Sequence, residues 1–397
     1  MGYKGKKLLV QGAGRGHLGL IQAAKEMGIY TIVTGMPGNY PCTPLADKIC
    51  YADIKDKQAV LRIAQDEGVD GIVICCSDTG LQTVGYVCDQ MNLSGISENS
   101  AVLCADKSLM KDRLMKSKVR TAKYMRIYQE VDIQECIDTL RFPMIVKAVD
   151  LQGSRGIYIV KNVEELAVNF RKVMNDTAKD HCIVEEFIEG NEFGAQAFVY
   201  NGEILFVLPH GDQTIMCQTA VPIGHYMPLE MNEEILEDVQ EQAEKAIRAL
   251  KLDNCAVNID FIEKEGKAYI IELTGRVGAN CLPELTSNYW GVNYYSMIIA
   301  MALGGNPKEI FEKRNTKPCC TMAKMLKSTQ SGIVKQISHS ANSPDCNAIL
   351  FVTAGSEVRA FTNCNDAIGQ IVVTADDYDT CCEKIEEYVK NMHIIIN

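Results

Sequence analysis

No stretch of the sequence is apolar over the roughly eighteen residues that a membrane-spanning helix needs, and no apolar segment of signal-peptide length precedes the first glycine-rich turn. Basic residues number 40 against 51 acidic ones, so the formal net charge is −11. The lysines and arginines form no cluster of the kind that a nucleic-acid-binding face requires. We therefore expect a soluble, unexported protein that binds neither membranes nor nucleic acid, and we favour small-molecule chemistry.

Cysteine is abundant, but the patterns that would give it a structural or metal-binding role are missing. The 17 cysteines are scattered and form adjacent doublets but no C-x-x-C pair. This spacing argues against a disulfide framework and against a cysteine-based zinc site. Free thiols in this number are typical of a reducing cytoplasm, where most of them act as small buried hydrophobes.

Strands and helices alternate in the N-terminal quarter of the chain. The pattern predicts strands over residues 7–10, 30–34 and 71–76, and helices over 20–27, 58–67 and 80–90. Strands that are apolar on both faces and alternate with helices indicate a parallel sheet. We expect an open parallel α/β domain over residues 1–98, within a chain of 397 residues that is long enough for two or three domains.

The first strand leads into a glycine-rich loop in which Gly14, Gly16 and Gly19 satisfy G-x-G-x-x-G. A dinucleotide site also needs an acidic residue at the end of the second strand, and here that strand ends in Thr34-Gly35-Met36. Two interpretations stay open. The glycines permit a tight turn and close helix packing, or the helix N-terminus receives a carboxylate or phosphate of a second substrate.

Two runs of alternating polarity, residues 258–261 and 268–273, flank a polar segment that contains glycine and predict a β-hairpin. If the two strands stay in phase, the even-numbered positions Asn258, Asp260, Glu272 and Thr274 share one face. The odd-numbered positions form the expected buried face: Ile259, Phe261, Tyr269, Ile271 and Leu273.

Asp260 and Glu272 would then converge on one spot. Two carboxylates without a counter-charge repel each other, and a hard cation between them relieves the repulsion. Mg²⁺ is the natural candidate, because it takes one or two carboxylates together with phosphate oxygens and water. The alternative is a pair of solvated acids on an exposed face. The Gly-bracketed turn from Thr274 to Gly278 favours the metal, because it places the donor fork of Arg276 directly after the second acid.

The pattern N-x-D-F, a short hairpin and E-x-x-x-R resembles the metal and phosphate hairpin of the ATP-grasp superfamily. The resemblance implies metal ligands at Asp260 and Glu272, with Thr274 standing where the family usually has asparagine. It gives Arg276 a catalytic role on the substrate carboxylate or the tetrahedral oxyanion. It also implies the fold: an open parallel α/β domain, a central ATP-grasp fold of two α+β subdomains and a small C-terminal α+β subdomain.

Two lysines and a loop complete the phosphate site that the resemblance implies. Lys107 follows an aspartate at the start of a basic helix, whose other lysines we interpret as a solvated face. Lys147 lies at the end of an apolar strand. A glycine- and serine-containing loop follows, and then a second strand over residues 157–160. Such a loop can fold its backbone amides over polyphosphate; a plain hairpin is the alternative. The loop residues assigned to the nucleotide are Gly153, Ser154, Arg155 and Gly156.

The segment from Cys182 to Phe193 resembles the linker that receives adenine. Backbone groups near Glu186, Phe187 and Ile188 would read the adenine edge, while Glu185 and Glu192 would contact hydroxyl or amino groups, Glu192 being the candidate for the ribose.

Residues 210–227 are expected to be irregular, with exposed histidines. In the resembling ligases this region borders the acceptor, so His210 is a candidate substrate contact together with Gly278 and Arg276.

The remaining pattern predicts an amphipathic helix over 233–250, an apolar helix over 289–303 and a hairpin formed by 348–352 and 355–360. We expect the ATP-grasp domain over 99–310, with its nucleotide flap over 120–185, and the C-terminal subdomain over 311–397. A homodimer is expected from family habit alone.

The function that the resemblance implies is an ATP-dependent carboxylate–amine ligase. It would use ATP with Mg²⁺, or with Mn²⁺ as the alternative, to convert a small carboxylate into an acyl phosphate that an amine then attacks, releasing ADP and phosphate. A carboxyphosphate-forming enzyme related to carboxylases or carbamoyl-phosphate synthases, and a nucleotide-binding regulator without turnover, stay open. The motifs do not identify the carboxylate or the amine.

Overall fold

The N-terminal segment folds into the predicted parallel sheet. The computed structural model describes residues 2–151, 156–216, 220–315 and 317–397. The strands are β1 (Lys7–Gln11), β2 (Tyr30–Gly35), β3 (Lys48–Tyr51) and β4 (Gly71–Val73), arranged in the order β3-β2-β1-β4 and all parallel. Strand β4 ends at Val73, three residues earlier than expected. The helices of this segment are α1 (Leu18–Glu26), α2 (Lys57–Glu67), α3 (Leu81–Met91) and α4 (Glu98–Ala105).

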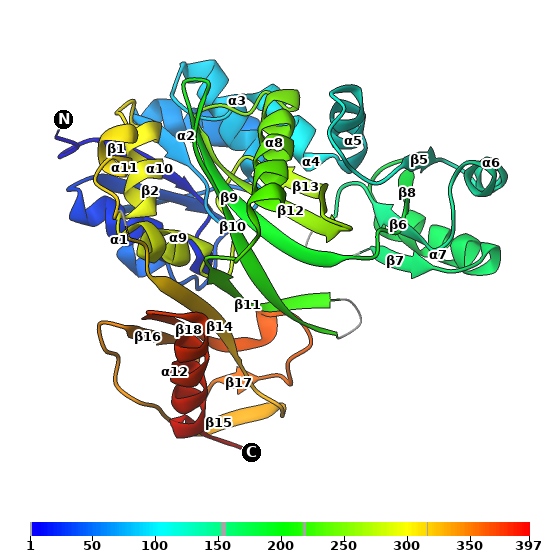
Figure 1. The fold of residues 1–397 in the computed structure, drawn as a ribbon. Coiled ribbons are helices and arrows are strands. Elements are labelled where there is room, and N and C mark those ends of the chain that lie inside the picture. The colour runs from blue at the N-terminus through cyan, green and yellow to red at the C-terminus, as the bar shows by residue number, and fades with distance from the viewer. Residues whose placement is uncertain (1, 152–155, 217–219, 316) are drawn as a thin grey trace.

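An eight-stranded sheet forms the centre of the molecule (Figure 1). Its strand order is β13-β12-β9-β10-β11-β14-β18-β16, and its neighbours pair antiparallel. The predicted amphipathic helix is α8 (Glu233–Ala249), which lies between β11 and β12 in the chain. Five of the strands come from the middle of the chain: β9 (Asn191–Tyr200), β10 (Glu203–Met216), β11 (Ala220–Met227), β12 (Cys255–Lys264) and β13 (Lys267–Thr274).

Strands β10 and β11 correct the prediction for residues 210–227. The glycines, the proline and the polar residues of this stretch resemble a loop, but the backbone is extended and pairs Gly211 with Tyr226 and Asp212 with His225. A register shift at Gln213 and Thr214 accommodates the irregular pattern. The prediction is wrong because polar residues alone do not indicate a loop. In this sheet they lie on paired strands and contact other buried polar groups.

The hairpin β12–β13 has the predicted register where it matters for the site, because Asp260 lies opposite Glu272 and Asn258 opposite Thr274. A bulge after Asp260 pairs Phe261 with Ile270, so the alternation reverses towards the turn. Two of the five expected core positions are therefore wrong. Tyr269 and Ile271 are only half-buried, whereas Ile259, Phe261 and Leu273 are buried as predicted, together with Ala268 and Ile270.

A separate four-stranded sheet, ordered β5-β8-β6-β7, projects to one side of the molecule in Figure 1. Its strands pair antiparallel, and β6 with β7 forms the predicted strand pair around the loop at 152–156. Side chains such as Met144, Val146, Phe170 and Val184 give this part its own core. The elements are α5 (Lys107–Lys116), β5 (Tyr124–Ile127), α6 (Asp132–Thr139), β6 (Met144–Ala148), β7 (Ile157–Val160), α7 (Val163–Asp176) and β8 (Cys182–Glu186).

The chain after the hairpin returns to the N-terminal sheet. The single helix expected over 289–303 is two helices, α9 (Leu282–Trp290) and α10 (Tyr294–Ala302), followed by the short α11 (Lys308–Phe311). Gly291, at φ 64°, ends α9, and the Asn293 side chain accepts from the Ser296 amide to begin α10. Tyr294 and Ile298 of α10 pack in one core with residues of β1 and α1.

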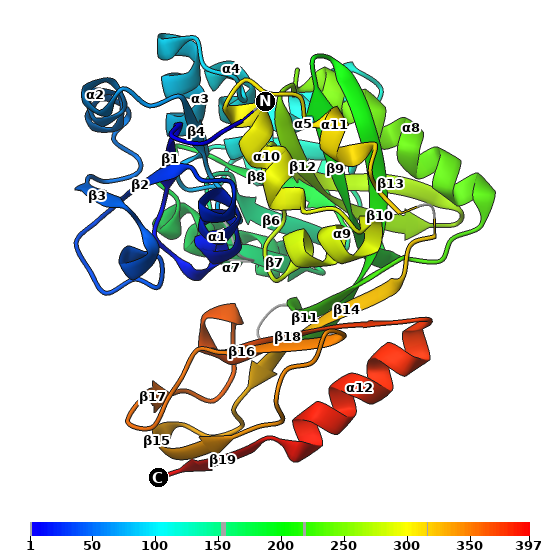
Figure 2. The ribbon, with the colours of Figure 1, turned by 90° about the vertical axis from the view of Figure 1, so that its left-hand side faces the viewer.

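The C-terminal segment lies below the rest in Figure 2. The expected hairpin is wrong, because β16 pairs with β18 while β17 pairs with β15. Since β14 and β18 also continue the central sheet, that sheet runs across residue 310; the division of the chain at residues 98 and 310 stays a prediction. The elements are β14 (Cys320–Lys327), β15 (Gly332–Ser338), β16 (Cys346–Leu350), β17 (Glu357–Val358), β18 (Ala367–Ala375), α12 (Tyr378–Asn391) and β19 (His393–Ile396).

Within the described part of the chain, no helix has the length and apolar character needed to cross a membrane.

The packing of α10 on β4 gives a stability prediction. A Cβ atom added at Gly71 would lie 2.3 Å from the carbonyl oxygen of Ala302, which is backbone and cannot rotate away. Gly71→Ala should therefore destabilise the protein by about 1–3 kcal/mol, the usual cost of overpacking. Thermal unfolding measures the change. Gly2→Ala, where a Cβ has no atom within 4 Å, is the control and should not shift the midpoint. Equal midpoints for both variants would contradict the tight contact.

Candidate active site

A row of polar side chains crosses the central sheet from β13 to β10. Asp260 lies opposite Glu272 on one side and Gly194 on the other, and Gly194 lies opposite His210. A Cβ atom at Gly194 would lie 2.3 Å from the His210 ring, so the glycine gives the imidazole room above strand β9. The register thus brings residues from four strands onto one face.

The two carboxylates in this row interact unfavourably. Burial and the neighbouring carboxylates of Glu272 and Asp212 raise the pKa of Asp260 to about 8. Glu272 is partly exposed, and its Oε2 lies 3.2 Å from the Nζ of Lys107. Burial and the second carboxylate both favour the protonated form of Asp260. A divalent cation between the two carboxylates would relieve this unfavourable arrangement. Asp260 and Glu272 therefore fit Mg²⁺.

Lys147 shares its partner with a lysine that the sequence did not single out. The Nζ atoms of Lys111 and Lys147 each lie 3.2 Å from Oε2 of Glu185. Lys111, expected on a solvated face, has a side chain that is 2% exposed, and its ammonium donates to Thr121 at 2.6 Å. Burial alone would raise the pKa of Glu185, but the two lysines outweigh it and lower that pKa. The spacing of four residues from Lys107 places Lys111 on the same side of α5, which is the signal that could have found it.

Arg276 and Thr274 both bind Asp78, which follows β4 in the N-terminal part of the chain. The Arg276 guanidinium donates from Nε and Nη2 to the two carboxylate oxygens of Asp78, and the Thr274 hydroxyl donates to Oδ1 at 2.6 Å. Burial alone would raise the pKa of Asp78, but Arg276 outweighs it and lowers that pKa. In this structure the Thr274 hydroxyl hydrogen is therefore used by Asp78.

Asp78 was missed as a site residue, although its position carried a signal. The turn that contains it follows the carboxyl end of a strand in a parallel sheet, which is where ligands of such sheets bind. The neighbouring Cys76 thiol donates to the Gly278 carbonyl oxygen at 3.2 Å. Two contacts thus join this edge of the sheet to the turn that carries Arg276.

A buried amide network orients Asp260. Gln196, which is fully buried, donates from Nε2 to the Asn258 Oδ1 at 2.6 Å and accepts from the Gly278 amide at 2.9 Å. Asn258 in turn donates to Asp260 at 3.0 Å. Three hydrogen bonds in series thus connect Gly278, a predicted substrate contact, to Asp260. Sequence reasoning missed Gln196, because its partners come from other strands and a distant turn.

The two histidines of β10 and β11 are buried, which corrects the expectation that they are exposed. His210 is 1% exposed and His225 is 5% exposed. Both Nδ1 atoms lie within hydrogen-bonding distance of Oδ1 of Asp212, at 2.9 Å for His210 and 2.6 Å for His225. Burial would raise the pKa of Asp212, but the imidazoles outweigh it and hold the pKa below its ordinary range.

A cavity of about 330 Å³ lies at the glycine-rich loop, and one of its lining residues, Cys76, contacts Gly278 of the Arg276 turn. His17 is buried against it, and burial lowers the pKa of its imidazole to about 4, so the ring is neutral. Neither ring nitrogen makes a hydrogen bond within the described residues. The cavity is lined by Gly12, Ala13, Gly14, Gly16, His17, Gly35, Met36, Tyr40, Asp53, Ile54, Cys75, Cys76 and Ser77.

Comparison with known proteins identifies the superfamily. The sequence profile of the ATP-grasp domain family matches residues 140–284. Along its whole length the chain is similar to phosphoribosylglycinamide synthetase from Anaerococcus prevotii, a crystal structure with 45% sequence identity and a TM-score of 0.89 that covers 99% of this chain and 100% of that one. This chain belongs to the ATP-grasp superfamily. The recognition made from the hairpin and the predicted fold class are both confirmed.

More distant relatives share the ATP-grasp fold. The crystal structure of L-amino acid ligase from Bacillus licheniformis has a TM-score of 0.82 at 18% identity and covers 99% of each chain. The carbamoyl phosphate synthase large chain of Clostridium beijerinckii is 23% identical over 325 residues, which are 77% of this chain but 30% of that protein. The chain thus spans less than a third of the length of that relative.

The remaining predicted nucleotide residues flank the small sheet. Gly153, Ser154 and Arg155 lie outside the described residues, while Gly156, at φ 64°, begins the turn into β7. In the predicted adenine linker, the amides of Glu186 and Phe187 donate to Lys123 and Pro143, and the Glu186 carboxylate accepts from the Arg141 amide. Ile188 follows without regular structure, and Glu192 is exposed near the start of β9.

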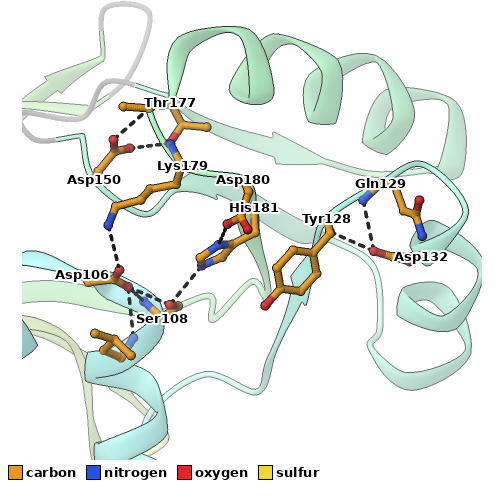
Figure 3. Close-up of polar contacts among 12 residues, drawn as sticks. Asp106, Ser108, Tyr128, Gln129, Asp132, Asp150, Thr177, Lys179, Asp180 and His181 are labelled. Atoms are coloured by element: carbon orange, nitrogen blue, oxygen red, sulfur yellow. Dashed lines mark hydrogen bonds and ion pairs between the residues drawn. The ribbon is translucent and has the colours of Figure 1, made fainter.

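Polar contacts join the start of α5, where Lys107 lies, to the residues just before β8 of the small sheet (Figure 3). Asp106 accepts from the Ser108 and Leu109 amides as the helix cap and lies 3.7 Å from the Lys179 ammonium. His181 lies between Ser108, at 3.2 Å, and Asp180, at 2.8 Å. This trio resembles a hydrolase triad, but the Ser108 hydroxyl is buried and donates to Asp106, so it is a structural contact.

The raised pKa of Asp260 predicts that Mg²⁺ binding depends on pH. The metal must displace the proton that Asp260 holds below about pH 8, so Mg²⁺ affinity should rise about tenfold per pH unit between pH 6 and 7 and level off at higher pH. Calorimetric titration at several pH values measures this, and Asp260→Asn should remove the dependence. A flat pH profile for the wild type would contradict it. Without metal, the folded state binds more protons than the unfolded state in this window, so stability should fall as pH rises through it.

Proposed function

We propose that this protein is an ATP-dependent ligase that activates a small carboxylate as an acyl phosphate and transfers the acyl group to an amine, releasing ADP and phosphate. One observation carries the proposal: the carboxylate pair of Asp260 and Glu272 lies between a lysine, Lys107, and the turn of Arg276. This arrangement offers acids for a metal, a cation for phosphate and a guanidinium for a carboxylate.

Asp260 and Glu272 would hold Mg²⁺, or Mn²⁺, with Thr274 as a further candidate ligand. The metal supplies charge neutralisation to the transferring phosphoryl group. The chain's own contribution is to hold the two carboxylates in place, through the Asn258 contact on Asp260 and the Lys107 contact on Glu272. Lys107 is then positioned to pass from Glu272 to a phosphate oxygen when the cation takes over the carboxylate.

Lys147 would provide the second phosphate charge, together with the amides predicted for residues 153–156, of which 153–155 lie outside the described residues. Its partner Glu185 is buried with Lys111 and Lys147 on one oxygen, so we assign it the role of orienting these ammonium groups. Backbone groups at Glu186, Phe187 and Ile188 would contact adenine, and Glu192 would contact the ribose.

Arg276 would hold the substrate carboxylate and then the oxyanion formed when the amine attacks. Its Nε and Nη2 are occupied by Asp78, and Nη1 donates to the neighbouring carbonyl of Val277 at 3.1 Å. The side chain is therefore fixed before substrate arrives, which lowers the entropic cost of reaching the reactive geometry.

The cavity at the glycine-rich loop would receive the acceptor, because it adjoins the Arg276 turn and contains the neutral, buried His17. The name of the relative from Anaerococcus prevotii, phosphoribosylglycinamide synthetase, suggests phosphoribosylglycinamide as the product. The name of a relative from Fusobacterium nucleatum, phosphoribosylamine–glycine ligase, suggests glycine and phosphoribosylamine as the substrates. Arg15 lies between two cavity-lining glycines, but its guanidinium packs 4.2 Å from the Phe351 ring centroid, so a negatively charged acceptor would require the side chain to turn toward the cavity.

A second substrate pair, two amino acids, is favoured by the cavity lining itself. Among the described residues that line the cavity, Asp53 is the one charged side chain and no lysine or arginine is present. A carboxylate in the cavity suits an ammonium group better than a phosphate.

ADP release tests the proposal. Purified protein with Mg-ATP should release ADP and phosphate when one acid and one amine are both present, with glycine plus phosphoribosylamine and pools of amino acids assayed separately. Glu272→Gln should abolish this release, while Glu265→Gln, on the exposed turn of the same hairpin, should leave it unchanged. AMP with pyrophosphate would overturn the proposed chemistry. Turnover that needs bicarbonate would indicate the carboxyphosphate alternative, and nucleotide binding without turnover would indicate the regulator.

The Asp78 contact gives a separate prediction for the transfer step. Asp78→Asn weakens the bidentate partner of Arg276 and should lower amide formation by about 100-fold, the cost of misplacing a catalytic group by about an ångström. ATP hydrolysis without amine should be reduced much less. Comparing product formation with ADP release measures the uncoupling, and Asp66→Asn, exposed on α2, is the control. Tight coupling in Asp78→Asn would show that Asp78 does not position Arg276 for transfer.

A further inference from the structure

A second group of metal-binding side chains lies on the same face of the sheet as the carboxylate pair. His210, Asp212 and His225 each offer one ligand atom, and these atoms all lie within 4.8 Å of one another. They are the one such trio among the residues that the structure describes. Asp212 lies opposite His225 across β10 and β11, so the strand pairing itself brings the ligands together.

The geometry suits one cation. The two imidazole planes are nearly perpendicular, at 84°, with ring centroids 5.3 Å apart, so both rings can face one point without contact between them. Both Nδ1 atoms are directed at the same oxygen, Oδ1 of Asp212, at 2.9 and 2.6 Å. Bonds of about 2.0–2.2 Å to a shared tetrahedral cation would require these atoms to move apart by on the order of 0.5 Å.

The ligand types distinguish this trio from the Asp260–Glu272 pair. Imidazole suits zinc and other borderline divalent metals, whereas Mg²⁺ prefers sites made of oxygen alone. Both histidines are buried and Asp212 is partly buried, so the trio is enclosed in the way that metal ligands usually are. Three protein ligands leave one position of a tetrahedral cation for water or substrate.

We propose that His210, Asp212 and His225 form a second metal site, which takes one zinc-class divalent cation and is distinct from the Mg²⁺ site of the ligase reaction. The cation would link β10 to β11 and offset the charge of Asp212 beside Asp260. The test of this site does not require ligase activity, because none of its ligands is assigned to nucleotide or Mg²⁺; a cation on His210 would replace the direct substrate contact predicted for that residue.

The metal-free arrangement is the competing state. There each ring donates its Nδ1 hydrogen to Asp212, and the Gln196 amide, 3.4 Å from Nε2 of His210, donates to that nitrogen. When Nδ1 binds a cation, the hydrogen of His210 moves to Nε2, where it faces the Gln196 NH2 group. Asn258 and Gly278 hold that group in place, so the ring must move away from Gln196 as it binds the cation. The Gln196 contact thus favours the metal-free state, which a bound cation must outweigh, and a binding experiment separates the two states.

Cobalt binding tests the proposal. Protein without an affinity tag, stripped by chelator and kept in millimolar Mg²⁺, is titrated with Co²⁺ and read by visible absorption, with Zn²⁺ as competitor. We expect one Co²⁺ per chain, displaced by Zn²⁺, without the near-ultraviolet thiolate band that the many cysteines would give. Wild-type protein should also unfold at a higher temperature with Zn²⁺ than without it.

Variants locate the cation. His225→Ala and Asp212→Asn should each weaken Co²⁺ binding by more than about 100-fold, since loss of an outer partner alone costs 10–100-fold. His393→Ala, an exposed histidine on β19, and Glu272→Gln should bind like wild type. Thermal unfolding without metal checks that each variant is folded. Absence of Co²⁺ binding in the wild type, equal binding in folded His225→Ala, or loss in Glu272→Gln would overturn the proposal.

Discussion

The buried ion pair between Asp78 and Arg276 is the contact on which the proposed site depends. It joins the edge of the N-terminal parallel sheet to the turn that follows the hairpin, and the Thr274 hydroxyl binds the same carboxylate. Removing one partner of a buried pair leaves the other charge without compensation, which costs about 3–5 kcal/mol. The direction of the Arg276 side chain therefore depends on an interaction between distant parts of the chain, while the Cys76 contact to Gly278 helps to hold the turn itself.

Around this contact lie buried and partly buried acidic and basic side chains that would be destabilising without their partners. Burial and two neighbouring carboxylates raise the pKa of Asp260. Glu272 forms an ion pair with Lys107, and Glu185 forms ion pairs with Lys111 and Lys147. An incoming cation and polyphosphate would exchange these contacts for their own: the cation satisfies the acids, and the phosphates take the ammonium groups. Such a site is prepared for ligand at the expense of the metal-free state, as strained or repulsive groups at functional sites usually are.

The sequence predicted those parts of the site that a short segment determines. The register of Asp260 and Glu272 follows from alternation along one hairpin, and the β-α alternation of the first hundred residues determines the parallel sheet. Gln196 could not be found in this way, because its partners Asn258 and Gly278 lie 62 and 82 residues away. Asp78 and Lys111 carried positional signals, but the partners that define their roles lie 74 to 198 residues away. His210 and His225 were wrongly expected to be exposed, because a polar stretch with glycine and proline resembles a loop unless the neighbouring strands that cover it are known.

Transfer of oxygen from substrate to phosphate tests the central claim most directly. If the carboxylate attacks the terminal phosphoryl group and the amine then displaces phosphate, a substrate labelled with ¹⁸O in both carboxylate oxygens must leave one label in the released phosphate and one in the amide. Mass spectrometry of the phosphate reads the result. The account predicts one ¹⁸O per phosphate released; unlabelled phosphate alongside amide formation would show that no acyl phosphate forms and would contradict it.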